Sequence, residues 1–300
     1  MSAPILVTGS NRSGTTWLGK LLAAADGVGY INELFNLDHP QPGLCAARFP
    51  HWFMYLTEDN GRPYVEPIGR TLRFEYDWGD AARTAASPRN ALRALRALPK
   101  TRVPDGSRPL LKDPIAVFSA AWMARTFGMQ VVLSVRHPAA FAASLERLTW
   151  EFDFSQLLAQ PLLMRDHLEP YRGRLERYVR DRPDIIDQAG LLWTLIYGSV
   201  GDDAWLTVRQ EDVAIQPEAE LQRLYTELGL TWSDEVADRV AAATGEHNPA
   251  EAPRGRAHTS ARDSRAAVSA WRQRLSPEQI ARVYELTQPV ASRYYSDSDW

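Results

Sequence analysis

Short apolar runs alternate along the chain with stretches in which apolar residues recur at helical spacing. The runs contain few polar residues, which is typical of strands buried on both faces of a parallel sheet. Five such runs predict strands over residues 5–8, 28–31, 109–111, 131–135 and 205–208. Strands that alternate with helices predict an α/β fold, built on a doubly wound sheet of about five parallel strands with flanking helices.

Helix signals lie between several of these runs. Residues 16–25 repeat apolar side chains on one face and stop at an Asp-Gly pair. Residues 114–127 and 138–148 both start with proline, a favoured first residue of a helix. A further helix is predicted over residues 276–295, because its first residues, Ser-Pro-Glu, form a good cap.

Two segments do not follow this rhythm. Residues 36–107 are rich in proline, arginine and aromatic residues, and they contain one predicted helix over residues 88–98. We expect this segment to be an insertion that covers the cleft on the acceptor side, with a purely structural cover as the alternative. Residues 244–265 are a second irregular stretch and carry four arginines. The whole chain, residues 1–300, is predicted to form a single domain.

Composition narrows the classes of function. A net charge of −3 argues against a protein that binds nucleic acid mainly through electrostatics. The single cysteine, Cys45, allows no intrachain disulfide and suits a reducing compartment. The chain shows neither a signal-peptide pattern nor an apolar run near the ~18 residues of a membrane span, so a cytoplasmic location is expected. The histidines lack paired metal-ligand spacing, so no metal site is expected.

A glycine-containing loop follows the first predicted strand. Residues 9–16 read Gly-Ser-Asn-Arg-Ser-Gly-Thr-Thr, close to the nucleotide P-loop pattern G-x-x-x-x-G-K-[ST]. Backbone N–H groups and a helix N-terminus in such a loop point at one bound anion. Thr15, however, stands where the P-loop has the lysine that holds the β- and γ-phosphates of ATP. The loop therefore predicts a phosphate-type ligand other than a nucleoside triphosphate.

Each predicted strand ends in polar or charged residues. Ligands bind at the carboxyl ends of the strands in open α/β sheets. The residues at these ends are Arg12, Asn32, Glu33, Lys112, Asp113, Arg136, His137, Arg209, Gln210, Glu211 and Asp212. We expect four cations and at least one carboxylate of this set to converge at one edge of the sheet.

Three of the strand ends resemble the family of sulfotransferases that use 3′-phosphoadenosine 5′-phosphosulfate (PAPS). Arg12-Ser13-Gly14-Thr15-Thr16-Trp17 is similar to the family's 5′-phosphosulfate loop, in which Lys or Arg precedes Ser-Gly-Thr-Thr-Trp. Arg136 and Ser144, eight positions apart, are similar to the second family signature. Residues 209–213 are similar to the family's Arg-Tyr-Glu-Asp-Leu segment. The resemblance is to bacterial and carbohydrate sulfotransferases, spans most of the chain and is weakest over residues 36–107.

The resemblance implies a P-loop-like fold, PAPS as the sulfuryl donor and adenosine 3′,5′-bisphosphate as the product. It implies that the loop and Arg12 hold the 5′-phosphosulfate, and that Arg136 and Ser144 hold the 3′-phosphate. Arg254-Gly255-Arg256 is similar to a Lys-Gly-Arg loop that closes over the 3′-phosphate in carbohydrate sulfotransferases. This similarity places residues 244–265 over the cofactor.

The resemblance also implies the catalytic groups. In carbohydrate, tyrosylprotein and several bacterial sulfotransferases, a glutamate at the position of Glu33 is the general base. The small-molecule cytosolic enzymes instead use a histidine one position after a Lys-Thr pair, and the corresponding residues here are Lys112-Asp113-Pro114. Glu33 is therefore the expected base, with Asp113 as the second candidate. Lys112 and Arg12 are expected to reach the transferred sulfuryl group from opposite sides.

Structural roles are the alternatives for these residues. An ion pair with Glu146 or Asp113 at the helix entry is the alternative for Arg136. A helix-capping or surface carboxylate is the alternative for Glu33. For Lys112 the alternative is a surface side chain whose apolar stem lies along the protein.

The predicted reaction is transfer of a sulfuryl group from PAPS to a hydroxyl of a sugar, a glycolipid or another secondary metabolite. A P-loop-type small-molecule kinase is the alternative enzyme, weakened by Thr15 and by the lack of a clear Mg²⁺-binding aspartate after an apolar strand. A non-catalytic nucleotide-binding protein on the same fold is the other alternative. Four residues argue against it: Arg12, Glu33, Lys112 and Arg136.

Overall fold

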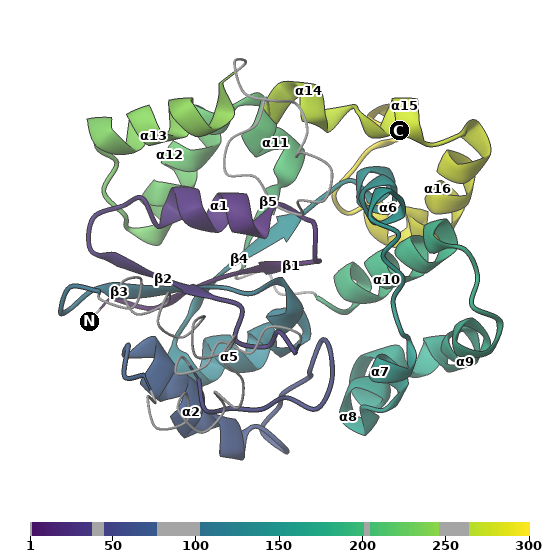
Figure 1. Ribbon diagram of the computed structural model, residues 1–300, viewed down its shortest axis with the longest axis horizontal. Coiled ribbons are helices and arrows are strands. Elements are labelled where there is room, and N and C mark those ends of the chain that lie inside the picture. The colour runs from purple at the N-terminus through teal and green to yellow at the C-terminus, as the bar shows by residue number, and fades with distance from the viewer. Residues whose placement is uncertain (1, 38–44, 77–102, 201–204, 246–263) are drawn as a thin grey trace, which may run out of the picture.

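The central sheet has five parallel strands in the order β2-β3-β1-β4-β5. The computed structural model describes residues 2–37, 45–76, 103–200, 205–245 and 264–300. The strands are β1 (Ile5–Gly9), β2 (Val28–Asn32), β3 (Arg108–Lys112), β4 (Gln130–Val135) and β5 (Leu206–Arg209). All five predicted strands are present within one residue of their expected bounds, so the doubly wound α/β sheet is confirmed (Figure 1).

β1 lies at the centre of the sheet and is buried along its whole length. Side chains of a strand alternate between its two faces. Ile5 and Val7 accordingly join one apolar cluster, which includes Leu18 of the following helix, whereas Leu6 joins the other cluster. The uniformly apolar run in the sequence therefore reflects a sheet that is covered on both faces.

Helices cover the two faces. Figure 1 shows α1 (Thr15–Leu22), α12 (Pro217–Leu228) and α13 (Asp234–Thr244) on one face of the sheet. On the other face lie α2 (Arg62–Leu72) and α5 (Ala120–Phe127). This three-layer arrangement leaves the carboxyl ends of the strands as the place where loops can form a site.

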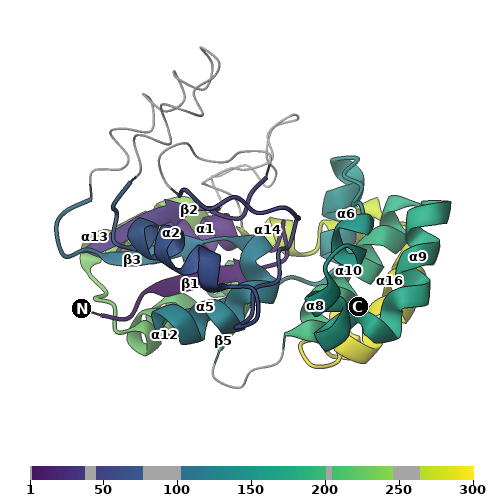
Figure 2. The same cartoon turned by 90° about the horizontal axis from the view of Figure 1, so that it is seen from below.

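A helical bundle stands beside the sheet at the end where β4 runs into α6 (Figures 1 and 2). Its main helices are α6 (Pro138–Arg147), α10 (Ile185–Ser199) and α16 (Pro277–Ala291), which pack against one another. Gly190 allows the close approach of α10 to α16, because a Cβ at this position would lie 2.8 Å from Leu286 Cδ1. The bundle thereby places α10 directly behind the loops at the strand ends.

The other described elements are short and lie mostly around the bundle and after β5. They are α7 (Ser155–Leu158), α8 (Pro161–Leu163), a π-helical turn (Met164–Leu168), a 3₁₀ helix (Glu169–Tyr171), α9 (Arg172–Asp181), α11 (Gln210–Ile215), α14 (Ser264–Val268), α15 (Trp271–Arg274) and a 3₁₀ helix (Asp297–Asp299).

Three predicted helices differ from the structure at their ends. The helix expected over residues 276–295 ends at Ala291, because the N–H groups of Arg293 and Tyr294 bond three residues back. The helix expected over residues 16–25 ends at Leu22, because the N–H groups of Ala24 and Ala25 bond three residues back instead of four. The helix expected over residues 114–127 begins as a 3₁₀ helix, Pro114–Ser119, before α5. The helix predicted over residues 88–98 lies outside the described residues. None of the helices in the described part of the chain is long and apolar enough to cross a membrane.

The described part of the segment 36–107 belongs to the core. Phe49, Leu56 and Ile68 lie in the larger apolar cluster, and α2 packs below the sheet. Phe49 also stacks between the rings of Phe35 and Tyr64, with centroids 4.1 and 5.1 Å away. These contacts favour the structural alternative for this portion of the segment.

Candidate active site

The loop after β1 has the shape of an anion cradle. Gly14 takes a left-handed backbone, φ 88°, immediately before the first residue of α1. A Cβ at Gly14 would lie 2.9 Å from Gln210 Cγ, so a side chain would be both strained and crowded here. The first N–H groups of a helix have no partner within it and carry its positive dipole end. The loop can therefore present backbone donors to a phosphate, as its sequence predicted.

Buried hydroxyl groups hold this loop from behind. Tyr197 on α10 is fully buried, and its hydroxyl accepts the Ser10 N–H at 3.0 Å and donates to the Ser134 carbonyl at 2.8 Å. Ser134 on β4 in turn donates to the Ser13 carbonyl at 2.7 Å. Tyr197 was not predicted as a site residue; its only signal in the sequence is a tyrosine hydroxyl within the mostly apolar stretch Leu191–Tyr197 of α10.

The two predicted anion-binding signatures meet in space. Arg12 Nε donates to Ser144 Oγ at 3.2 Å, and Arg136 donates from a terminal guanidinium nitrogen to the Arg12 carbonyl at 2.9 Å. The Arg136 carbonyl accepts the Trp193 indole N–H at 2.9 Å. Glu146, the expected alternative partner of Arg136, accepts a hydrogen bond from Gln279 at 2.7 Å. Arg12, Arg136 and Ser144 thus form one polar group at the ends of β1 and β4.

Glu33 and Lys112 form an ion pair at the ends of β2 and β3. Lys112 is 1 % exposed and its stem passes beneath α1, where a Cβ added to Gly19 would lie 3.0 Å from Lys112 Cγ. The Glu33 N–H donates to the Lys112 carbonyl at 2.8 Å, and Asn36 donates to Glu33 Oε2 at 2.6 Å. Lys112 is therefore buried and directed at a carboxylate, which argues against a surface role for its side chain.

Asp113 supports the turn that carries Glu33. Its side chain is fully buried, with Oδ2 accepting the Phe35 N–H at 2.8 Å and Oδ1 accepting the Ile115 N–H at 3.1 Å. Burial raises the pKa of the Asp113 carboxyl to about 7. Because both oxygens face backbone donors away from solvent, this geometry favours Glu33 over Asp113 as a base.

His137 is a structural residue at the start of α6. Its Nδ1 accepts the Ala139 N–H at 3.3 Å, and its ring stacks on Trp271 with centroids 4.8 Å apart. Tyr295 and Trp300 contact the same ring at 4.9 and 4.5 Å. Burial lowers the pKa of the imidazole to about 3, so the ring is neutral near pH 7.

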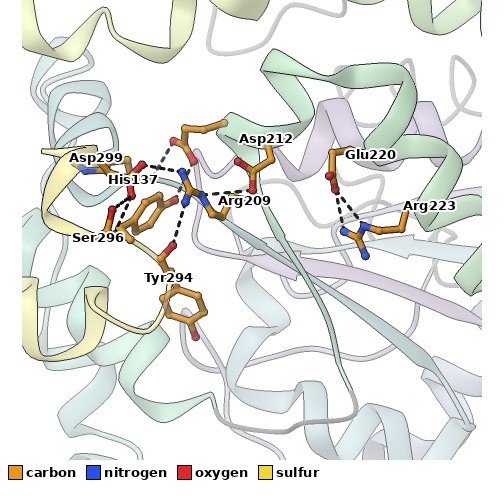
Figure 3. A network of polar contacts seen from close by, with 10 residues as sticks. His137, Arg209, Asp212, Glu220, Arg223, Tyr294, Ser296 and Asp299 are labelled. Carbon is orange, nitrogen blue, oxygen red and sulfur yellow. Dashed lines mark hydrogen bonds and ion pairs between the residues drawn. The ribbon is translucent and has the colours of Figure 1, made fainter.

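The cation at the end of β5, Arg209, binds the C-terminal segment. Arg209 pairs with Asp299 at 3.0 Å and with Asp212 at 3.5 Å, and it donates to the Tyr294 carbonyl at 3.3 Å (Figure 3). Its guanidinium also lies over the Tyr295 ring, 4.6 Å from the centroid. Three of the four expected cations thus lie at the ends of the neighbouring strands β3, β1 and β4, and the fourth binds the C-terminal segment.

The other predicted site residues lie as follows. Ser13 and Thr15 are buried in the loop, and Thr16 and Trp17 are half-buried in the first turn of α1. The predicted residues Arg254, Gly255 and Arg256 lie outside the described part of the chain. Within the described ranges, no group of three or more His, Cys, Asp or Glu residues could hold a metal ion.

Comparison with known proteins relates this geometry to a family. The model of the sulfotransferase family matches residues 4–234. Carbohydrate sulfotransferase 7 of Mus musculus is 40% identical over 127 residues, which cover 40% of this chain and 25% of that protein. The corresponding protein of Rattus norvegicus is 40% identical over 87 residues, covering 29% of this chain and 17% of that protein. The chain thus matches about a quarter or less of the length of these curated relatives.

A solved structure shares the fold. The sulfotransferase domain from the Synechococcus PCC 7002 olefin synthase superposes with a TM-score of 0.50 at 17% identity, covering 99% of this chain and 97% of that domain. The family match covers residues 4–234, and this structural likeness shows the same fold over 99% of the chain. On its strand order, its loop after β1 and its match to the family, the chain belongs to the sulfotransferase family.

Proposed function

We propose that this protein transfers a sulfuryl group from PAPS to a hydroxyl of a sugar, a glycolipid or another secondary metabolite. The observation that carries the proposal is the ion pair between the buried Lys112 and the partly buried Glu33, at the strand ends beside the loop of β1. It brings a cation and a carboxylate to one place, and sulfuryl transfer to a hydroxyl requires both: charge stabilisation and proton removal. Family membership supports the reaction class.

The residues at the strand ends fit the donor. The N–H groups at the start of α1 suit the 5′-phosphosulfate, and Arg12 adds a positive charge from the same loop. Arg136 and Ser144 are assigned to the 3′-phosphate, because a guanidinium and a hydroxyl are strong donors to phosphate oxygens. When bound, PAPS supplies a sulfuryl group on a phosphate leaving group.

Glu33 would act as the general base. Its two oxygens accept hydrogen bonds from Lys112 and Asn36, an arrangement that suits the ionised carboxylate. Glu33 takes the proton of the acceptor hydroxyl as that oxygen bonds to sulfur and the bond from sulfur to the phosphate oxygen breaks. Lys112 would stabilise the negative charge on the sulfuryl oxygens and the leaving group.

A sugar hydroxyl is the acceptor that the comparisons favour. The matching proteins of mouse and rat are named carbohydrate sulfotransferases. The alignment with the mouse protein includes 127 residues. A carboxylate rather than a histidine at the base position supports the same choice.

Ligand-dependent stability tests the donor. Adenosine 3′,5′-bisphosphate should raise the melting temperature, with a stabilisation of about 2.7 kcal/mol when the ligand is present at 100 times its Kd. ATP with Mg²⁺ should stabilise much less, because Thr15 replaces the lysine that binds the β- and γ-phosphates. Thermal unfolding with each ligand at equal concentration checks this. Equal or greater stabilisation by Mg-ATP would contradict the proposal and favour a kinase.

Turnover separates an enzyme from a non-catalytic binding protein. PAPS is supplied with a panel of mono- and oligosaccharides, and release of adenosine 3′,5′-bisphosphate is measured with and without each sugar. We expect sugar-dependent release. Binding of the bisphosphate without release on any hydroxyl acceptor would support the non-catalytic alternative.

A further inference from the structure

A buried carboxylate lies behind the predicted 3′-phosphate site. Glu211, the second residue of α11, is 5 % exposed. Its Oε1 accepts the His137 N–H at 3.0 Å and its Oε2 accepts the Tyr295 hydroxyl at 2.9 Å. Burying an ionisable side chain costs free energy that an apolar residue would not. The reaction proposed above gives this charge no role.

The hydrogen bond to His137 acts on the peptide unit that begins at Arg136. The N–H of that peptide belongs to His137 and is bound by Glu211. The carbonyl of the same peptide belongs to Arg136 and is bound by the Trp193 indole at 2.9 Å. Both polar atoms of one peptide plane are therefore held by buried side chains from α10 and α11. The plane sets the direction in which the Arg136 side chain leaves the backbone.

The C-terminal segment closes this arrangement. Tyr295 donates to Glu211, and Arg209 lies over the Tyr295 ring while it binds Asp299. Figure 3 shows Arg209 between Asp212 on one side and the C-terminal residues on the other, with His137 next to them. These contacts hold the Glu211 carboxylate in place relative to β4.

We propose that Glu211 is a positioning residue for Arg136. Its carboxylate and the Trp193 indole clamp the peptide between Arg136 and His137, and thereby aim the Arg136 guanidinium at the 3′-phosphate of the donor. This inference rests on the proposed function, because it assumes that Arg136 binds that phosphate. A residue needed only for folding would affect all ligands alike, whereas a residue that aims Arg136 affects only those with a 3′-phosphate.

The test compares two ligands that differ by one phosphate. The Kd values of adenosine 3′,5′-bisphosphate and adenosine 5′-monophosphate are measured by calorimetry for the full chain and for Glu211→Met, which keeps the length of the side chain but cannot accept the His137 N–H. We expect the Kd of the bisphosphate to rise about tenfold, the size of one lost charge-assisted hydrogen bond, and that of the monophosphate to change less than about twofold.

Two further variants keep the test decisive. Glu211→Gln can still accept the His137 N–H through its amide oxygen, so it should restore most of the preference for the 3′-phosphate. Trp193→Phe removes the hydrogen bond at the other end of the same peptide and should reproduce the selective loss, even if Glu211→Met does not fold. Asp212→Asn, at the neighbouring residue, whose side chain is only partly buried and does not contact the peptide of Arg136 and His137, is the matched control and should leave the preference unchanged.

The outcomes separate this inference from the proposed function. Equal weakening of both ligands in Glu211→Met and Trp193→Phe, or an unchanged preference in both, would overturn the positioning role. If the unaltered protein binds the two ligands equally well, the assignment of Arg136 to a 3′-phosphate is wrong, and the proposed function fails first.

Discussion

Two residues assigned to chemistry have a left-handed backbone. Arg12 has φ 67° and Glu33 has φ 45°. A residue other than glycine in this region costs about 1–2 kcal/mol. The surroundings hold both in place, since the Glu33 N–H donates to the Lys112 carbonyl and the Arg12 carbonyl accepts from Arg136. Glycine would serve a simple turn better, so strain at these two positions supports a role for their side chains.

Removing the proton acceptor tests Glu33. Glu33→Gln keeps the shape of the side chain but cannot take a proton, so kcat should fall about 10²–10⁴-fold, the usual size of general-base catalysis. The Kd of adenosine 3′,5′-bisphosphate should barely change, because Glu33 is assigned to the acceptor. The loss should shrink for acceptors with a more acidic hydroxyl. Steady-state kinetics with two such acceptors, together with calorimetry, check these expectations.

Asp113→Asn is the control for this assignment. It should change the stability of the protein and leave at least part of the turnover, because the carboxylate lies against backbone N–H groups. Abolished turnover in a folded Asp113→Asn protein, with turnover retained in Glu33→Gln, would move the proton transfer to β3.

The buried carboxyl of Asp113 also gives a pH dependence. Its pKa is raised from 3.8 to about 7, so between these values the folded protein keeps a proton that the unfolded chain has lost. The contribution to the free energy of unfolding is therefore full below about pH 4 and is lost as the pH rises through about 7. Relative to Asp113→Asn, the unaltered protein should become less stable across this window and level off above it. Urea unfolding of both proteins at several pH values measures the difference, and a difference that rises with pH would contradict the expectation.

At the scale of single elements, the site depends on close packing of α1 against β3. Gly19 lies in the interior of α1, a position where glycine ordinarily costs about 0.5–1 kcal/mol relative to alanine. The Lys112 stem occupies the space that a Cβ would need. Helix α1 therefore has a residue of low helix propensity at this position, which leaves room for the Lys112 side chain.

Gly19→Ala should therefore separate stability from activity. The added Cβ would lie 3.0 Å from Lys112 Cγ and 3.1 Å from its Cβ, so the ammonium should move from its place and kcat should fall at least about tenfold. Gly173→Ala in α9 is the matched control, because a Cβ there meets nothing within 4 Å. The control should keep its kcat and gain a few tenths of a kcal/mol or more. Equal kcat values in the two variants would contradict the role given to Gly19.

The elements could be predicted because their signals are local. The apolar runs of β1 and β4 report burial on both faces, and the proline at the start of α6 marks its first residue. The 3₁₀ start before α5 was missed, since it depends on a cap from Asp113 rather than on periodicity. The carboxyl ends of the strands also indicated where the site lies.

The partners within the site could not be predicted, because they are set by tertiary packing. Nothing in the sequence relates Glu211 to Tyr295, 84 positions later, or Ser10 to Tyr197, 187 positions later. Arg209 was expected at the site as one more cation at a strand end, yet it binds Asp299 of the C-terminal segment. Position along the chain indicates the edge of the sheet, but not the direction of each side chain.

At the scale of the whole molecule, the site joins the sheet to the helical bundle. The loop after β1 is tied to α10 by Tyr197, and the end of β4 is tied to it by Trp193. Figure 2 shows the bundle beside the sheet, with α6 and α10 next to the strand ends. Binding of the donor should therefore depend on how the bundle docks.

Tyr197→Phe tests this dependence. It leaves the Ser10 N–H and the Ser134 carbonyl without their buried partner, which should lower the free energy of unfolding by about 1–3 kcal/mol. The Kd of adenosine 3′,5′-bisphosphate should rise several-fold as the loop relaxes. Tyr225→Phe is the control, because its hydroxyl donates to the Leu21 carbonyl at 2.7 Å, at the far end of α1. It should lose comparable stability and keep its affinity; equal affinities in the two variants would contradict the role of Tyr197.

The pairing of β3 determines the sign of the charge at the site. Lys112 lies opposite Val7 of β1 and Asn32 of β2, and the next residue is Asp113. A shift of the strand by one residue would exchange a cation for a carboxylate at the same place. The same shift would carry Lys112 into the buried place that Leu111 holds in the larger apolar cluster, so the apolar contacts also oppose it.

The polar ends of the strand add to this alignment. Arg108 binds the carbonyls of Ala3 and Leu228 at one end, and Asp113 binds the Phe35 N–H at the other. Two residues that need not touch the donor thus help to place a cation rather than a carboxylate at the site. Redesign of this strand would have to keep its alignment before it kept any catalytic side chain.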